Sequence, residues 1–165
     1  MIEHYPHWLP EPLEVMPWGS ETYDLIYECF ERDLKPNPPR YNGKFIFYSK
    51  NLIDGKEEGF WHITDRDVSR GKRGNRLPEP ARCAKICWIA PMLRNSGHPD
   101  LLEWDYVEGD GGVNRYIWLF DYDYIIILQD LGRKYRLRTA YTVDNENERN
   151  KLQKKYERRI KEDPG

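Results

Sequence analysis

The spacing of hydrophobic positions is helical in two segments of the first half of the chain. In residues 20–34 the apolar side chains recur every three or four positions, and Ser20 supplies an N-cap. Residues 79–90 repeat this spacing with a proline in the first turn, where proline is tolerated. Between the two predicted helices, residues 44–49 favour a short strand, and the sequence FWHIT (60–64) favours an extended or packed segment.

In the second half of the chain the hydrophobic period changes to that of strands. Four runs rich in aromatic and β-branched residues are separated by short turn sequences, which is typical of an antiparallel meander. The runs occupy residues 101–107, 113–120, 124–130 and 134–143. The polar residues from 145 to 161 then carry one apolar stripe, as in a helix that faces solvent.

These segments predict an α+β fold with N-terminal helices, a four-stranded antiparallel meander and a C-terminal helix. The length of 165 residues fits one domain, which we assign to residues 20–162, after an extended segment at residues 1–19. No apolar run is long enough to span a bilayer, and no signal-peptide pattern begins the chain. We therefore expect no membrane partner.

Positive charge is concentrated in two segments, although the formal net charge is only −2. From Arg66 to Arg94, eight cations stand against two carboxylates, and three of these cations lie in a predicted surface loop at residues 69–75. Residues 131–143 contain four cations and no carboxylate. Such clusters on a nearly neutral protein indicate either a local anion-binding surface or two solvated charged faces.

The second basic segment includes the last predicted strand, in which side chains alternate between two faces. Alternation places Arg136 and Arg138 on one face, and Thr139 and Tyr141 on the opposite face, unless a bulge changes the register. Arginine can hold phosphate oxygens with two parallel hydrogen bonds and keeps its charge, so the arginine face could bind a phosphate. The alternative is that both arginines simply face solvent.

Metal sites are weakly indicated. Cys83 and Cys87 lie one helical turn apart with His98 nearby, but no second pair follows at a zinc-site spacing, which favours small core cysteines. Asp121 and Asp123 could hold Mg²⁺ for phosphodiester cleavage, yet they occupy a predicted hairpin turn, where Asp is common. The three cysteines predict no disulfide framework, which favours a reducing cytoplasm. Neither a glycine-rich phosphate loop nor a serine elbow is present, so no cofactor is expected.

Three short motifs connect the sequence to a known superfamily. They are the histidine after paired aromatics in FWHIT, the sequence RCAKICWIAP (82–91), and TAY (139–141) in the last strand. Over residues 44–156 their order resembles small phage-associated members of the barnase/EndoU/colicin/RelE superfamily of metal-independent endoribonucleases. Members of this superfamily place a histidine early in the domain, and a hydroxyl residue with an aromatic on the last strand. The resemblance implies His62, Thr139 and Tyr141 as catalytic residues.

The resemblance also implies a reaction in which RNA supplies its own nucleophile, the 2′-hydroxyl, and a 2′,3′-cyclic phosphate is left. The protein then needs a base, an acid and a cation that stabilises the charge on the phosphate. The position of this cation is less fixed in the superfamily, and its candidates are Arg82, Lys85, Arg136 and Arg138, of which Arg82 is grouped with the catalytic residues. The substrate-binding candidates are Lys85, Arg94, Arg136 and Arg138.

A toxin or prophage effector that acts on RNA in the cytoplasm would have a neutralising antitoxin or immunity protein as a partner. The alternative is a catalytically inactive module of the same fold that binds RNA or protein, because a fold can lose its chemistry and keep its surface. His62 itself could instead be a structural histidine that is packed by Phe60 and Trp61.

Overall fold

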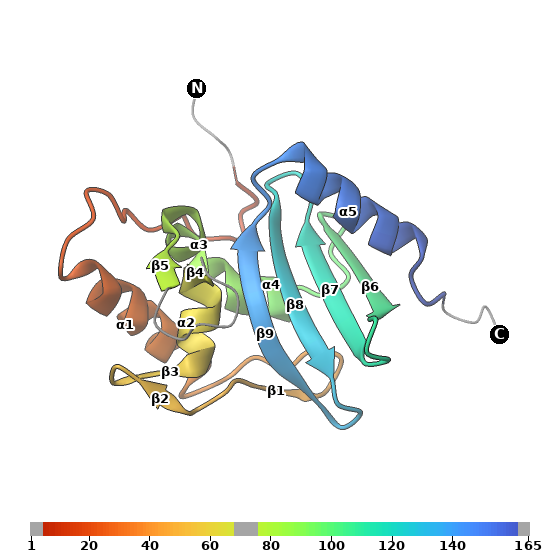
Figure 1. Ribbon diagram of the computed structural model, residues 1–165, viewed down its shortest axis with the longest axis horizontal. Coiled ribbons are helices and arrows are strands. Elements are labelled where there is room, and N and C mark those ends of the chain that lie inside the picture. Colours follow the sequence, from red (N-terminus) through yellow and green to blue (C-terminus); the bar gives the residue numbers. More distant parts are fainter. Residues whose placement is uncertain (1–4, 68–75, 162–165) are drawn as a thin grey trace.

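The centre of the protein, in a computed structural model that describes residues 5–67 and 76–161, is a five-stranded mixed sheet (Figure 1). Its strand order is β1-β9-β8-β7-β6. β1 pairs in parallel with β9, and all other neighbours pair antiparallel. The strands are β1 (Phe45–Phe47), β6 (Leu101–Val107), β7 (Val113–Leu119), β8 (Tyr124–Asp130) and β9 (Lys134–Thr142).

The predicted α+β class is confirmed, and the four strands predicted in the second half are β6 to β9. The sheet is not the purely antiparallel four-stranded meander that the sequence predicts, because β1 adds to β9 in parallel, with Ile46 opposite Tyr135. Turn residues and hydrophobic period report only on neighbours along the chain, whereas this pairing joins segments about ninety residues apart. The loop predicted at residues 69–75 lies outside the described residues.

Among the described residues, five helical segments cover one face of the sheet or its edge, and a sixth crosses the other face (Figure 1). Two short hairpins, β2–β3 and β4–β5, flank α2 in the chain. The helical segments are α1 (Thr22–Leu34), α2 (Glu58–Thr64), α3 (Pro80–Ala84), η1 (Ile86–Trp88), α4 (Ile89–Arg94) and, on the other face, α5 (Glu146–Glu157). The hairpin strands are β2 (Leu52–Ile53), β3 (Lys56–Glu57), β4 (Asp65–Asp67) and β5 (Arg76–Pro78).

The two helices predicted before the sheet are found with corrections. The first begins at Thr22 and not at Ser20, and Thr22 itself accepts a hydrogen bond from the Gly19 amide at 2.8 Å. The helix predicted over residues 79–90 is divided into α3, η1 and α4, because the cap residue Lys85 leaves the helical conformation.

Of the two alternatives predicted for FWHIT, the extended one is wrong, because these residues form most of α2, and the packed one is confirmed by the buried Phe60 and Ile63. Aromatic and β-branched residues favour strands as single residues, but tertiary contacts override this preference. In α2, Phe60 and Ile63 are fully buried at helical spacing, which extended geometry would place on opposite faces.

Each face of the sheet has its own hydrophobic core. The larger core lies between the sheet and helices α1 to α4, and Ile117 and Leu119 of β7 point into it. The smaller core lies under α5, where Trp118 and Ile125 meet Leu152 of the helix. Residues 5–19 contain no helix or strand, but they pack on the helix layer and accept a hydrogen bond from the Trp88 indole. No helix among the described residues is long and apolar enough to cross a membrane.

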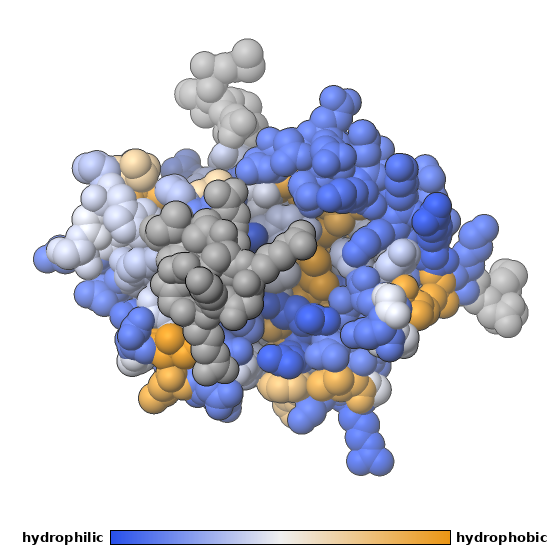
Figure 2. Space-filling model, in the orientation of Figure 1, coloured by the Kyte–Doolittle hydropathy of each residue, from blue (hydrophilic) through white to orange (hydrophobic). Residues whose placement is uncertain are grey.

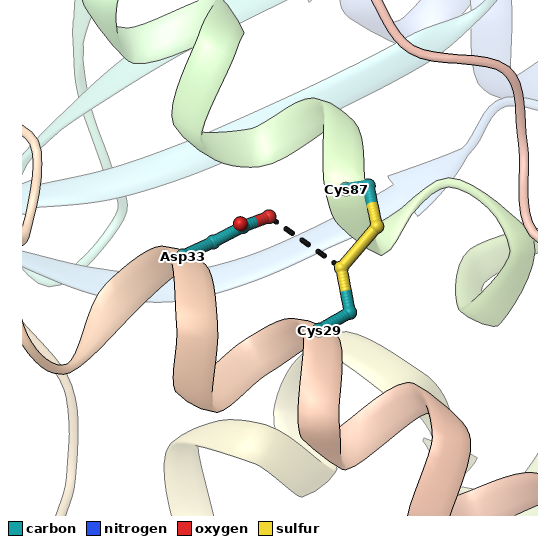
Figure 3. Close-up of side chains that lie close together, drawn as sticks. All are labelled: Cys29, Asp33 and Cys87. Atoms are coloured by element: carbon teal, nitrogen blue, oxygen red, sulfur yellow. Dashed lines mark hydrogen bonds between the residues drawn. A yellow bond between two sulfur atoms is a disulfide. The ribbon is translucent and has the colours of Figure 1, made fainter.

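A disulfide joins Cys29 of α1 to Cys87 of η1, with a sulfur–sulfur distance of 2.12 Å (Figure 3). The prediction of no disulfide framework is therefore wrong for these two cysteines. The pairing depends on how α1 packs against η1, and the two cysteines, 58 positions apart in the sequence, carry no local sign of it. Cys83 is a free, buried cysteine, as the prediction of a core residue requires.

Candidate active site at the contact of α2 and β9

A β-bulge in β9 decides which side chains of this strand share a face. Ile127 of β8 pairs with Thr139, but the next residue, Leu128, pairs with Leu137. Arg138 is thus an extra residue without a partner in β8, and an extra residue changes the alternation of side chains beyond it.

The bulge brings Arg136, Thr139 and Tyr141 to the same face of the sheet, because their partners are alternate residues of β8. This is the face on which α5 packs, and Tyr141 contacts the core under that helix. Arg138 lines the same pocket as Thr139 on this face. Strict alternation, which separates the two arginines from Thr139 and Tyr141, is therefore wrong beyond the bulge.

α2 lies along β9 beyond the short stretch of that strand that β1 covers. The hydroxyl of Thr139 donates a hydrogen bond to the backbone carbonyl of His62 at 3.0 Å. The side chain of His62 is only 26% exposed, and its Nε2 atom lies 3.4 Å from Oε1 of Glu58, one helical turn earlier. A carboxylate and an imidazole at this distance can share or transfer a proton.

Glu58 is a residue that the sequence analysis did not single out. Its signal is the spacing of four between Glu58 and His62, which brings two side chains together only in a helix. An extended FWHIT segment separates the same residues by roughly 13 Å. An extended interpretation of this segment therefore gives no reason to pair Glu58 with His62.

Arg82 of α3 fixes the C-terminal end of α2. Its guanidinium donates to the carbonyl of Asp65 at 3.0 Å and to that of His62 at 3.5 Å. Its Nε atom also lies 3.1 Å from the Glu79 carboxylate, and the side chain is only 16% exposed. The Nη1 atom thus has two backbone acceptors and the Nε atom lies beside a carboxylate, which is the arrangement of a positioning residue.

Tyr141 completes the cluster. The Arg82 guanidinium lies 5.2 Å from the centroid of its ring, within the range of a cation–π interaction. Burial raises the pKa of the Tyr141 phenol, and the Glu148 carboxylate raises it further, while Arg82 opposes the change. Tyr141 therefore keeps its proton at neutral pH and can donate a hydrogen bond. The four predicted catalytic residues are thus linked through direct contacts.

The four predicted substrate-binding cations divide between two surfaces. Arg136 and Arg138 lie on the face that carries Tyr141, and Arg138 is exposed. Lys85 instead lies over the ring of Trp88, which is part of the core on the helix side. Arg94, at the end of α4, donates to the carbonyl of Asn37 at 2.9 Å. The helix α4 lies behind the sheet in Figure 1. The structure does not bring Lys85 and Arg94 to the α2–β9 cluster.

A pocket of about 420 Å³ adjoins the cluster on the same face of the sheet. Figure 2 shows this face, where hydrophilic residues of α5 border a hollow with hydrophobic residues at its floor. Side chains from the β6–β7 turn, β7, β8, the β9 bulge and α5 line it. The lining residues are Glu108, Gly109, Asp110, Asn114, Tyr116, Ile127, Arg138, Thr139 and Lys155.

The zinc arrangement considered for Cys83 and Cys87 is not formed. Cys87 is bonded to Cys29, and the Cys83 thiol donates to the carbonyl of Thr64. Burial, with the nearby Asp65 carboxylate, raises the pKa of Cys83 to about 12, so that this residue stays a thiol.

In the part of the chain that the structure describes, one group of ligand atoms is compact enough for a metal ion, and it consists of Cys29, Asp33 and Cys87. Its two sulfur atoms are joined in the disulfide, as Figure 3 shows. The magnesium site considered for Asp121 and Asp123 is also not supported. Asp123 forms an ion pair with Arg149, and its positive φ of 51° places it in the β7–β8 turn, where Asp is common.

No protein-family model, no curated protein and no solved structure matches this chain. The resemblance drawn from the three short motifs therefore stays an expectation. Any functional conclusion rests on the geometry of the α2–β9 cluster and of the adjoining pocket.

Proposed function

We propose that the protein is a metal-independent endoribonuclease that cleaves RNA by attack of the 2′-hydroxyl on the adjacent phosphate and leaves a 2′,3′-cyclic phosphate. One observation carries the proposal: His62, Arg82, Thr139 and Tyr141, which come from three separate elements, are linked by direct contacts. Because the nucleophile belongs to the RNA, a proton-transfer pair and cations for the phosphate suffice.

The proton-transfer pair in this proposal is His62 with Glu58. One member takes the proton of the 2′-hydroxyl, and the other gives a proton to the departing 5′-oxygen. Their side chains are half-buried and 3.4 Å apart, which supports such an exchange of roles. A histidine changes its charge near neutral pH, which suits both steps.

The remaining residues bind the phosphate or position the pair. Arg138 is exposed beside Thr139 and can hold phosphate oxygens through its planar guanidinium. Arg82 and Thr139 act through the His62 carbonyl, and so they position α2 on the strand. Tyr141, which keeps its proton, can donate a hydrogen bond to the phosphate or stack on an unpaired base.

A second candidate function is an RNA-binding module without catalysis. The observation that favours it is the engagement of Arg82 and of the Thr139 hydroxyl by backbone carbonyls, which leaves neither group directed at a phosphate. Such a module would bind through Arg136 and Arg138, and it would need no proton transfer from His62.

Incubation of the purified protein with total RNA and with tRNA in excess EDTA separates these candidates. We expect endonucleolytic cuts in the presence of EDTA, because no step requires a metal ion. The 5′ fragments should end in a 2′,3′-cyclic phosphate, because the 2′-hydroxyl is the nucleophile. Mapping of both new ends by sequencing and by phosphatase sensitivity provides the measurement. RNA that is bound but stays intact would instead support the module, and cleavage abolished by EDTA would contradict the metal-independent mechanism.

The biological setting is also a proposal. A ribonuclease of this kind fits a toxin or prophage effector, and its host would need an antitoxin or immunity protein that covers the α2–β9 cluster. A cytoplasmic location follows from an RNA target, but the Cys29–Cys87 disulfide does not support it.

A further inference from the structure

The pocket beside the β9 bulge is continuous with the proposed active site. Its volume of about 420 Å³ lies within the range of small-ligand sites, which is roughly 300–1,000 Å³. Thr139 lines the pocket, while its hydroxyl contacts the carbonyl of His62. A group that sits at the β9 end of the pocket therefore lies beside Thr139, whose hydroxyl contacts the backbone of the residue proposed to transfer protons.

The walls of the pocket are held by a hydrogen-bonded network. The ring of Tyr116 stacks on Trp104, with centroids 5.0 Å apart, and its hydroxyl donates to the Glu108 carboxylate. Lys155 lies 2.8 Å from the Tyr116 hydroxyl, and the amide of Asn114 donates to Glu108 at 3.1 Å. Burial and the Glu108 contact raise the pKa of Tyr116 well above its ordinary value, so its proton stays in this network. A ligand would thus meet a preformed wall.

The two ends of the pocket differ in chemistry. The β6–β7 turn supplies two carboxylates. That of Glu108 is held by Tyr116 and Asn114 and lies 3.4 Å from the Lys155 ammonium. That of Asp110 accepts from the Gly112 amide through Oδ1 and offers its second oxygen as an acceptor to a ligand. The β9 end supplies the exposed guanidinium of Arg138. Ile127 provides apolar surface between the two ends. A ligand that fits has an anion at one end, a flat apolar body, and hydrogen-bond donors at the other end.

We propose that this pocket binds one nucleotide, with its phosphate on Arg138 and its base toward Glu108 and Asp110, and that it prefers bases with an exocyclic amino group over uracil. Adenine, cytosine and guanine each carry an amino donor that a carboxylate can accept. Uracil has a carbonyl oxygen where cytosine has its amino group, and this oxygen would face the carboxylates without a hydrogen bond.

The role of the pocket as a subsite of RNA cleavage rests on the proposed function, whereas binding of the nucleotide does not. The phosphate held by Arg138 would lie beside Thr139, which is next to it in the chain and contacts His62. In a cleaved RNA, the selected nucleotide would therefore adjoin the scissile phosphate. Cuts would be depleted at uridine.

Isothermal titration of the intact protein with the 3′-monophosphates of adenosine, cytidine, guanosine and uridine tests the proposal without any cleavage step. The matched comparison is cytidine with uridine, which have the same ring size. We expect uridine 3′-phosphate to bind about tenfold more weakly than cytidine 3′-phosphate, as expected when a charged acceptor loses its hydrogen bond. Arg138→Ala should weaken binding of all four by a similar factor, also about tenfold.

Two further variants complete the experiment. Arg133→Ala removes an exposed cation from the β8–β9 turn, about 16 Å along the strand, and should change no affinity. Asp110→Asn should reduce the ratio of the cytidine and uridine affinities, and it leaves the contact of Tyr116 with Glu108 intact.

The outcomes of these experiments distinguish failure of the nucleotide-binding proposal from failure of the ribonuclease proposal. Equal affinities for cytidine and uridine 3′-phosphates, absence of binding, or an unchanged affinity in Arg138→Ala would overturn the proposal for the pocket, even if RNA is cleaved. Selective nucleotide binding by a protein that leaves RNA intact would support the pocket and reject the ribonuclease.

Discussion

Replacement of His62 by alanine should lower the single-turnover rate of RNA cleavage by about 10²–10⁴-fold, which is the typical contribution of a general acid or base. The free energy of unfolding should stay close to that of the wild type, because the hydrogen bonds from Arg82 and Thr139 reach the backbone carbonyl of this residue, although the side-chain contact with Glu58 is lost. Alanine keeps that carbonyl. Cleavage rate and melting temperature, measured on the same preparations, provide the test.

A histidine with a purely structural role would behave differently. Its loss would lower the free energy of unfolding by roughly 1–3 kcal/mol, and any loss of activity would follow the unfolded fraction. His98→Ala is the matched control, because His98 is also half-buried beside a carboxylate, that of Asp100 at 3.3 Å. A stable, fully active His62→Ala protein would remove His62 from the mechanism.

The partnership of His62 with Glu58 has a signature of its own. If the two residues exchange protons with the same substrate, the effects of Glu58→Gln and His62→Ala should not multiply in the double variant. Independent effects would indicate that the 3.4 Å contact only orients the imidazole.

The sequence predicts well those elements whose bounds are set by residues next to them in the chain. Strands β6 and β8 begin and end at the predicted residues, because turn residues bracket each apolar run. What it misses depends on distant contacts. The strand predicted at residues 44–49 is found as β1, but its pairing with β9 forms only in the folded sheet, and α2 is helical because Phe60 and Ile63 must both enter the core.

The candidate site shows the same division. The motifs identify His62, Arg82, Thr139 and Tyr141, and the structure brings all four into one linked cluster. The motifs do not indicate the bulge at Arg138, since one extra residue in a strand leaves composition and period almost unchanged. The pocket is equally hidden, because its walls come from four strands or turns and a helix that meet only after folding.

Loss of the Cys29–Cys87 disulfide should lower the free energy of unfolding by about 4 kcal/mol, the magnitude expected for a cross-link that closes a loop of 58 residues. For a chain of this size the change corresponds to a melting temperature lower by about 10 °C. Thermal unfolding of the wild type with and without a thiol reductant measures it. The Cys29→Ser/Cys87→Ser protein should melt at the lower temperature under both conditions.

Cleavage at temperatures well below that transition should change little in the reduced protein. α1 keeps Ile26 and Phe30 in the core, and the hydroxyl of Tyr23 still donates to Asp65 at the end of α2. The disulfide then acts as a cross-link of the helix layer, at a distance from the groups that meet RNA. A melting temperature that is the same with and without the reductant would contradict a stabilising disulfide. A reduced protein that stays folded but loses cleavage would instead show that α1 sets the position of His62 through α2.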